Sequence, residues 1–126
     1  MIEKNREIWI GENRLYLDED NILNIINTGE IDEKTAIEMK EAVRKLTNMV
    51  DGGTHTLTDL NKAGKTTSKA RKIFQELADQ GGTRKTALFG MHPVARVLAS
   101  FVMGASKKED MRFFKTKEEA LAWIKE

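Results

Sequence analysis

The residues with the clearest chemical potential are Gly64-Lys65-Thr66, which match the last three positions of a phosphate-binding loop. A complete loop requires G-x-x-x-x-G-K-[ST], because its first glycine lets the backbone wrap around the phosphates. Asp59 occupies that first position, and its carboxylate would repel a triphosphate. Nucleotide binding through this tripeptide is therefore only a third hypothesis for the chain.

The segment around the tripeptide combines positive charge with hydroxyl groups. It follows residues 54–60, whose threonines and leucines favour a strand, and it precedes a helix expected over residues 69–80. In open α/β sheets, ligands bind beyond the carboxyl ends of the strands. The N-terminus of a helix also favours anions, through its free N–H groups and its dipole.

We therefore predict a loop over residues 61–68 that binds an anion, accepts a phosphoryl group or docks a partner. The plain alternative is a solvated loop whose hydroxyl groups cap the following helix. One of Thr66, Thr67 and Ser68 is expected to be that cap. The candidate site residues are Asp59, Asn61, Lys62, Lys65, Thr66, Thr67 and Ser68.

A second candidate surface is the helix expected from Pro93 to about Met103. Only Arg96 and Ser100 interrupt its apolar surface. A helix that is apolar nearly all round is buried on more than one side. We expect the apolar surface that the core does not cover to contact a second copy of the chain, a membrane surface or a ligand cavity. Self-association ranks first among these three alternatives. The candidate interface or ligand residues are Met91, Val97, Phe101 and Val102.

The remaining residue types predict no catalytic or metal site. His55 and His92 are the only histidines and lack the spacing of metal ligands. A structural role is expected for His55, and helix capping for His92. Cysteine is absent, which excludes disulfides and thiolate ligands. We therefore predict no enzyme activity, no cofactor and no metal.

Hydrophobic periodicity predicts alternating strands and helices. A hairpin over residues 7–17 and a strand ending at Gly29 are followed by a helix that Gly52-Gly53 should stop. Single strands and helices then alternate to the C-terminus, with Gly81-Gly82 ending the helix over 69–80 and Thr116 capping the last helix. Such alternation favours βαβ crossovers. We predict an α/β fold with a mixed, mostly parallel sheet, an N-terminal antiparallel hairpin and about four helices.

Length and composition limit the remaining possibilities. The chain of 126 residues suits one domain over residues 1–126. Its formal net charge of +1 gives no field that argues for nucleic acid as a partner. No apolar run is long enough for a signal peptide or a membrane span. We therefore expect a cytoplasmic protein with no transmembrane segment.

Several segments together resemble a known family. The strand ending in Thr58-Asp59-Leu60-Asn61 is followed by ARKIFQELAD, ALFGMHPVARVLASFV and MRFFKTKEEALAWIKE. These segments and their order resemble the STAS domain superfamily, and most closely its SpoIIAA-like branch of small prokaryotic proteins similar to anti-sigma factor antagonists. The resemblance covers nearly the whole chain and implies an STAS-like α/β domain without catalytic activity.

The resemblance also implies a site. In partner-switching antagonists of this type, a serine after the central strand is phosphorylated, and a hydroxyl residue and a glycine follow it. This chain departs from that pattern, because Thr66-Thr67-Ser68 is followed by Lys69 and Ala70. Asn61 also stands where those proteins often have a serine.

The leading functional hypothesis is a non-enzymatic regulatory or protein-binding module that uses the segment after the central strand. The alternative is a carrier or sensor of a lipid or another small apolar ligand, since the related Sec14 fold transfers lipids. A homodimer is compatible with either hypothesis.

Overall fold

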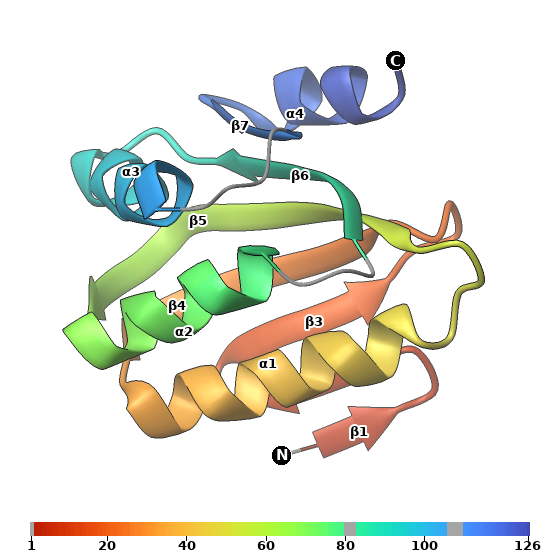
Figure 1. Ribbon diagram of the computed structural model, residues 1–126, viewed down its shortest axis with the longest axis horizontal. Helices are drawn as coiled ribbons and strands as arrows, with labels where there is room; N and C mark the ends of the chain where they lie inside the picture. Colours follow the sequence, from red (N-terminus) through yellow and green to blue (C-terminus); the bar gives the residue numbers. More distant parts are fainter. Residues whose placement is uncertain (1, 80–82, 106–109) are drawn as a thin grey trace.

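The computed structural model describes residues 2–79, 83–105 and 110–126. One sheet contains seven strands in the order β1-β2-β3-β4-β5-β6-β7 (Figure 1). Strands β1 to β4 pair antiparallel, and β4 to β7 pair parallel. The strands are β1 Ile2–Lys4, β2 Glu7–Ile10, β3 Asn13–Leu17, β4 Leu23–Ile31, β5 Thr54–Thr66, β6 Thr83–Phe89 and β7 Met111–Phe114. The helices are α1 Glu33–Thr47, α2 Ser68–Asp79, α3 Pro93–Ala105 and α4 Lys117–Ile124.

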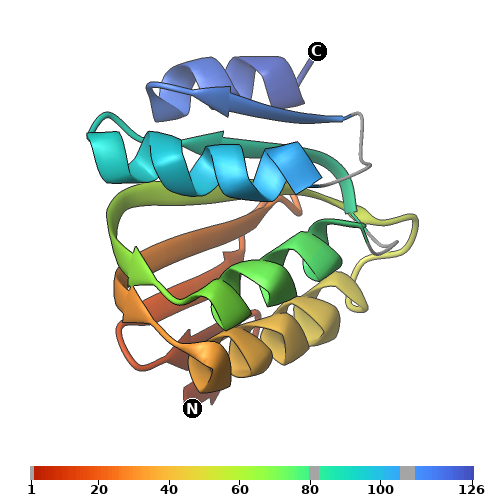
Figure 2. The same cartoon turned by 60° about the vertical axis from the view of Figure 1, so that its left-hand side comes forward.

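This arrangement confirms the predicted α/β fold with a mixed sheet and four helices. Helices α1, α2 and α3 cover one face of the sheet, and α4 covers the other (Figure 2). Alternate side chains of a strand point to opposite faces. Accordingly, Leu57 of β5 belongs to the cluster beneath α4, whereas Leu60 belongs to the cluster beneath α3.

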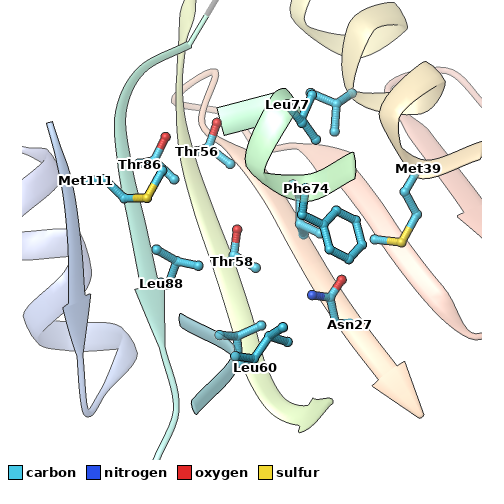
Figure 3. A pocket seen from close by; sticks show the side chains of 13 residues that line it. Asn27, Met39, Thr56, Thr58, Leu60, Phe74, Leu77, Thr86, Leu88 and Met111 are labelled. Carbon is cyan, nitrogen blue, oxygen red and sulfur yellow. The ribbon is translucent and has the colours of Figure 1, made fainter. Parts of the chain in front are cut away.

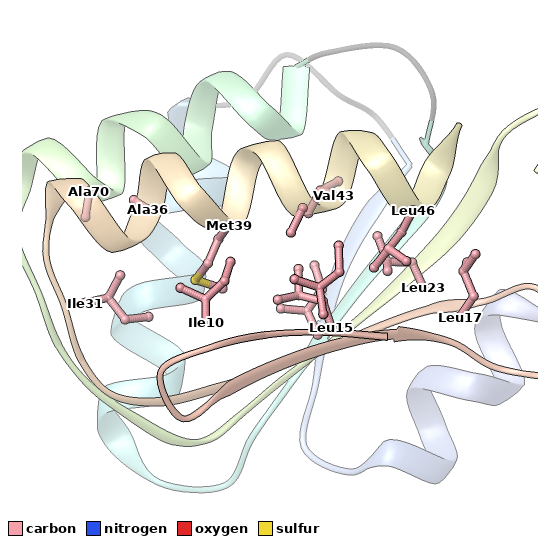
Figure 4. Packing of buried hydrophobic residues seen from close by; sticks show 13 residues of the cluster. Ile10, Leu15, Leu17, Leu23, Ile31, Ala36, Met39, Val43, Leu46 and Ala70 are labelled. Atoms are coloured by element: carbon pink, nitrogen blue, oxygen red, sulfur yellow. The ribbon is translucent and has the colours of Figure 1, made fainter. Parts of the chain in front are cut away.

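Helix α1 forms where its apolar periodicity predicts. Its stripe of Ala36, Met39, Val43 and Leu46 is buried against β2, β3 and β4 (Figure 4). Asp32 caps the helix, since its Oδ1 accepts a hydrogen bond from the Thr35 N–H at 2.9 Å. This hydrogen bond stabilises the ionised carboxylate and lowers the pKa of Asp32.

Several predicted boundaries are wrong. Helix α1 ends at Thr47, before the glycine pair, because the N–H groups of Met49 and Val50 bond three residues back, to Leu46 and Thr47, in turns that no longer follow the helical pattern. Strand β4 continues through Gly29 to Ile31, and the short strand β1 was not predicted. The predicted stop of α2 at Gly81-Gly82 lies outside the described residues. No helix in the described ranges has the length and apolar character needed to cross a membrane.

Candidate functional site

Strand β5 contains most of the segment that was predicted to be a loop. It extends to Thr66 and pairs with β4 as far as Ile31, so the prediction of a loop over residues 61–68 is wrong. The pairing continues because Gly64 lets the two backbones approach closely. A Cβ on Gly64 would lie 2.9 Å from the carbonyl carbon of Gly29 and 3.0 Å from its oxygen. Gly64 is therefore a packing residue between two strands.

This geometry removes the structural basis of the nucleotide hypothesis. A phosphate-binding loop directs successive N–H groups at one anion, whereas the N–H groups of an extended strand alternate in direction. Gly64 and Lys65 lie within the strand. The N–H of Thr67, just after it, donates to the Ile31 carbonyl at 3.1 Å.

The three hydroxyl residues at the start of α2 have different environments. Thr66 is buried, and its hydroxyl donates to the Gly64 carbonyl at 3.4 Å. Thr67 Oγ1 accepts from the Ala70 N–H at 3.1 Å, as an N-cap does. Ser68 is exposed, and its Oγ accepts from Arg71 Nη2 at 3.2 Å. Ser68 is thus the exposed hydroxyl without a capping role.

The capping bond gives a direct prediction for stability. Thr67→Ala should destabilise the fold by about 1 kcal/mol, because the Ala70 N–H loses its acceptor. Thr67→Asp should retain most of the stability, because aspartate is also a good cap. Urea unfolding monitored by circular dichroism measures both variants. Equal stability of Thr67→Ala and the unmodified chain would contradict the capping role.

A groove joins the start of α2 to α3, and we call it the α2–α3 groove. On α3 it presents Val94 and Val97, whose exposed fractions are 45% and 55%. On the other side lie a lysine, an arginine and the hydroxyl residues. Its lining residues are Gly64, Lys65, Thr66, Thr67, Ser68, Arg71, Pro93, Val94, Val97 and Leu98.

The groove therefore brings Val97 beside Lys65 and the three hydroxyl residues, which sequence reasoning had assigned to two separate surfaces. Their functional role stays a prediction. Sequence reasoning missed the contributions of Val94 and Leu98. Their signal was the spacing of three and four residues along α3, which places Val94, Val97 and Leu98 on one side of the helix.

Four other candidate residues, Asp59, Asn61, Lys62 and Met91, do not line the groove. Asp59 Oδ1 accepts from the Asn61 N–H at 2.9 Å, and Asn61 Oδ1 accepts from the Met91 N–H at 3.0 Å. The bond from Asn61 to Met91 attaches β5 to the connection before α3, and the bond from Asp59 is local to β5, so both are structural. Lys62 and Met91 are exposed. The side chains of Phe101 and Val102 lie outside the described residues.

Both histidines make structural hydrogen bonds. His55 Nδ1 accepts from the Lys85 N–H at 3.1 Å, linking β5 to β6. His92 directly precedes α3, and its backbone carbonyl accepts from the Ala95 N–H at 3.1 Å, as the predicted cap position requires. Its side chain lies away from the helix N–H groups, with Nε2 3.1 Å from the Leu60 carbonyl oxygen. Across the described ranges, no three histidine, aspartate or glutamate side chains gather as metal ligands would.

An ion pair with α1 lies beside the groove. Lys69 Nζ lies 3.7 Å from Glu33 Oε2, so the start of α2 shares one ion pair with α1. Lys65 and Arg71 line the groove itself. The groove thus combines an aliphatic wall with cationic side chains, which suits a ligand that is both apolar and acidic.

Comparison with solved structures identifies the fold. An uncharacterised protein of the DUF3478 family with a SpoIIAA-like fold, from Shewanella loihica PV-4, superposes with a TM-score of 0.66. It is 15% identical, and the match covers 98% of this chain and 99% of that one. The anti-sigma factor antagonist SpoIIAA in its unphosphorylated form gives a TM-score of 0.60 at 17% identity, covering 90% and 97%. The expected SpoIIAA-like fold is therefore confirmed.

Sequence comparison gives a family without an assigned activity. Residues 15–126 match the family described as a domain of unknown function, DUF7793. No curated protein sequence matches the chain.

Proposed function

Since the chain belongs to the DUF7793 family and has a SpoIIAA-like fold, we propose that it is a non-enzymatic regulatory module that binds a protein partner. The observation that carries the proposal is the α2–α3 groove, where exposed Val94 and Val97 lie beside Lys65 and Arg71. Protein interfaces bury an apolar centre within a polar rim. This groove offers both on the described surface.

The chemistry of the groove defines the partner surface that it suits. An aliphatic side chain of the partner would contact Val94 and Val97, and a neighbouring carboxylate would face Lys65 or Arg71. Removing the valine surface from water supplies most of the affinity, and opposite charges fix the orientation and speed the encounter. We therefore propose a partner segment that is apolar on one side and acidic beside it.

The proposal includes a modification site. One of the similar solved structures is described as an anti-sigma factor antagonist in its unphosphorylated form. In this chain, Ser68 is the hydroxyl best suited to a phosphoryl group, because Thr66 is buried and Thr67 caps α2. A phosphate on Ser68 would meet the positive end of the helix dipole and the nearby Arg71. It would also add negative charge to the cationic side of the groove, which would weaken docking of an acidic partner.

The test compares two exposed aliphatic residues on different helices. Val97 lines the groove and is 55% exposed, whereas Ile37 lies on α1 outside it and is 53% exposed. A protein should be captured from the native organism by the unmodified chain and by Ile37→Asp. Val97→Asp should fail to capture this protein, because the substitution removes apolar contact and the new carboxylate repels the acidic side chain of the partner.

The captured protein is then purified and titrated directly. Val97→Asp is expected to raise the dissociation constant by at least about tenfold, which corresponds to about 1.4 kcal/mol. Lys65→Glu should weaken binding as well, and Ser68→Asp should do so without lowering the melting temperature. Equal binding by Val97→Asp and Ile37→Asp would refute the groove as the docking surface. A dimer that dissociates only in Val97→Asp would identify a second copy of the chain as the occupant.

A further inference from the structure

The sheet and the three helices on its α1 face line a cavity with a volume of about 80 Å³ (Figure 3). It lies between the hydrophobic cluster beneath α1 and the cluster beneath α3, and Phe74 of α2 contacts both clusters. Met39 of α1, Phe74 and Leu77 of α2, and Leu98 of α3 form its apolar wall. A well-packed interior contains few voids larger than one water, so a cavity at this position requires an explanation.

The opposite wall, which the sheet supplies, contains four polar residues among apolar ones. Thr56 and Thr58 of β5 and Thr86 of β6 line it, together with Asn27 of β4 (Figure 3). Valine has nearly the same shape as threonine and suits a buried strand without adding a hydroxyl. Three threonines and an asparagine facing one cavity therefore place polar groups where packing alone does not require them.

Two of these polar groups have no hydrogen-bond partner within the described part of the chain. Asn27 Oδ1 and Thr56 Oγ1 are both unpaired, and each residue is only 5% exposed. Leaving a buried polar group unpaired is unfavourable by about 1–3 kcal/mol. Native structures satisfy nearly all such groups, so the unpaired oxygens indicate an occupant of the cavity.

The pairing of β4 with β5 is also irregular at Asn27. The pairing of Ile26 with Asp59 is followed by that of Thr28 with Lys62, which makes a bulge opposite Asn27. The Asn13 side chain accepts the Thr28 N–H at 2.8 Å and stabilises this irregular position. Bulges reorient side chains and are frequent beside functional sites. This bulge coincides with the asparagine that lines the cavity.

We infer that the cavity binds a small, mainly apolar molecule that carries a hydrogen-bond donor, such as an alcohol or a phenol. The donor would pair with Asn27 Oδ1 or Thr56 Oγ1, and the apolar body would contact Met39, Phe74 and Leu98. Water could pair with the oxygens but would leave the apolar wall hydrated, which is unfavourable. The inference does not depend on the proposed function, because Leu98 is the one described residue that lines both the cavity and the α2–α3 groove.

Methionine methyl groups allow a direct test by nuclear magnetic resonance. Met39 and Met111 line the cavity, whereas Met49 and Met91 are exposed elsewhere and serve as internal controls. Titration with phenol should shift the ¹³C-methyl signals of Met39 and Met111 in a saturable way and leave those of Met49 and Met91 unchanged. Benzene, which lacks the donor, should bind about tenfold more weakly than phenol.

Two variants of similar shape remove the acceptors. Asn27→Leu and Thr56→Val should each reduce the affinity for phenol towards that for benzene. The melting temperature without phenol should stay the same or rise, because an unpaired buried polar group has been removed. If Asn27→Leu does not fold, Thr56→Val decides by the same comparison. Equal affinities for phenol and benzene in every variant, or no saturable shift of Met39 and Met111, would overturn the inference.

Discussion

Replacing Trp123 with alanine is expected to destabilise the chain by about 3–5 kcal/mol, the largest effect of any substitution considered for this fold. Trp123 belongs to α4, and its side chain is buried between this helix and the sheet. Its ring centroid lies 5.7 Å from that of Phe114. Its backbone carbonyl also accepts from Lys85 Nζ at 2.9 Å. Because α4 has only eight residues, the loss of this side chain should detach it from the sheet.

Trp9 provides a matched control on a strand. It is half-buried, and its indole N–H donates to Glu7 at 2.9 Å. Trp9→Ala should therefore cause a much smaller loss of stability than Trp123→Ala, since it removes less apolar surface from the interior. Urea unfolding followed by circular dichroism measures both variants. Similar stabilities of Trp9→Ala and Trp123→Ala would show that the packing of α4 contributes little to the stability of the fold.

The same experiment addresses the prediction of one domain. If residues 1–126 form a single cooperative unit, tryptophan fluorescence and circular dichroism should report one coincident transition in the unmodified chain. Separate transitions for α4 and the rest of the chain would contradict that prediction.

Replacing Gly64 with alanine is expected to destabilise the chain by about 1–3 kcal/mol, the range for overpacked sites. The added methyl carbon would lie 2.9 Å from a backbone carbon of Gly29. A backbone atom cannot rotate away as a flexible side chain can, so β4 and β5 would have to separate near the α2–α3 groove. Chemical denaturation measures the change in the free energy of unfolding.

Lys65→Ala is the control, because Lys65 is exposed in the same strand and its truncation should change stability by less than about 0.5 kcal/mol. Gly64→Ala should also perturb the Gly29 amide signal in a nitrogen–proton correlation spectrum more strongly than Lys65→Ala does. If Gly64→Ala had no effect on stability, the role of Gly64 in strand packing would be refuted.

Features that depend on neighbouring residues could be predicted from the sequence. The spacing of Ala36, Met39, Val43 and Leu46 determines the buried face of α1, because a helix repeats every 3.6 residues whatever it packs against. Thr116 and Glu119 likewise fix the start of α4, where the Thr116 hydroxyl accepts the Glu119 N–H and donates to its carboxylate. The alternation of strands and helices sufficed for the fold class, since parallel strands require crossovers.

Features that depend on contacts between distant segments were revealed only by the tertiary structure. The sequence of residues 61–66 predicts a polar loop, yet pairing with β4 makes them part of a strand. The need for a glycine at position 64 follows only from the close approach of the Gly29 backbone. The groove joins α2 to α3 through their packing on the sheet. The unpaired oxygens of Asn27 and Thr56 could not be recognised from local patterns, because burial and hydrogen bonding depend on which segments the fold brings together.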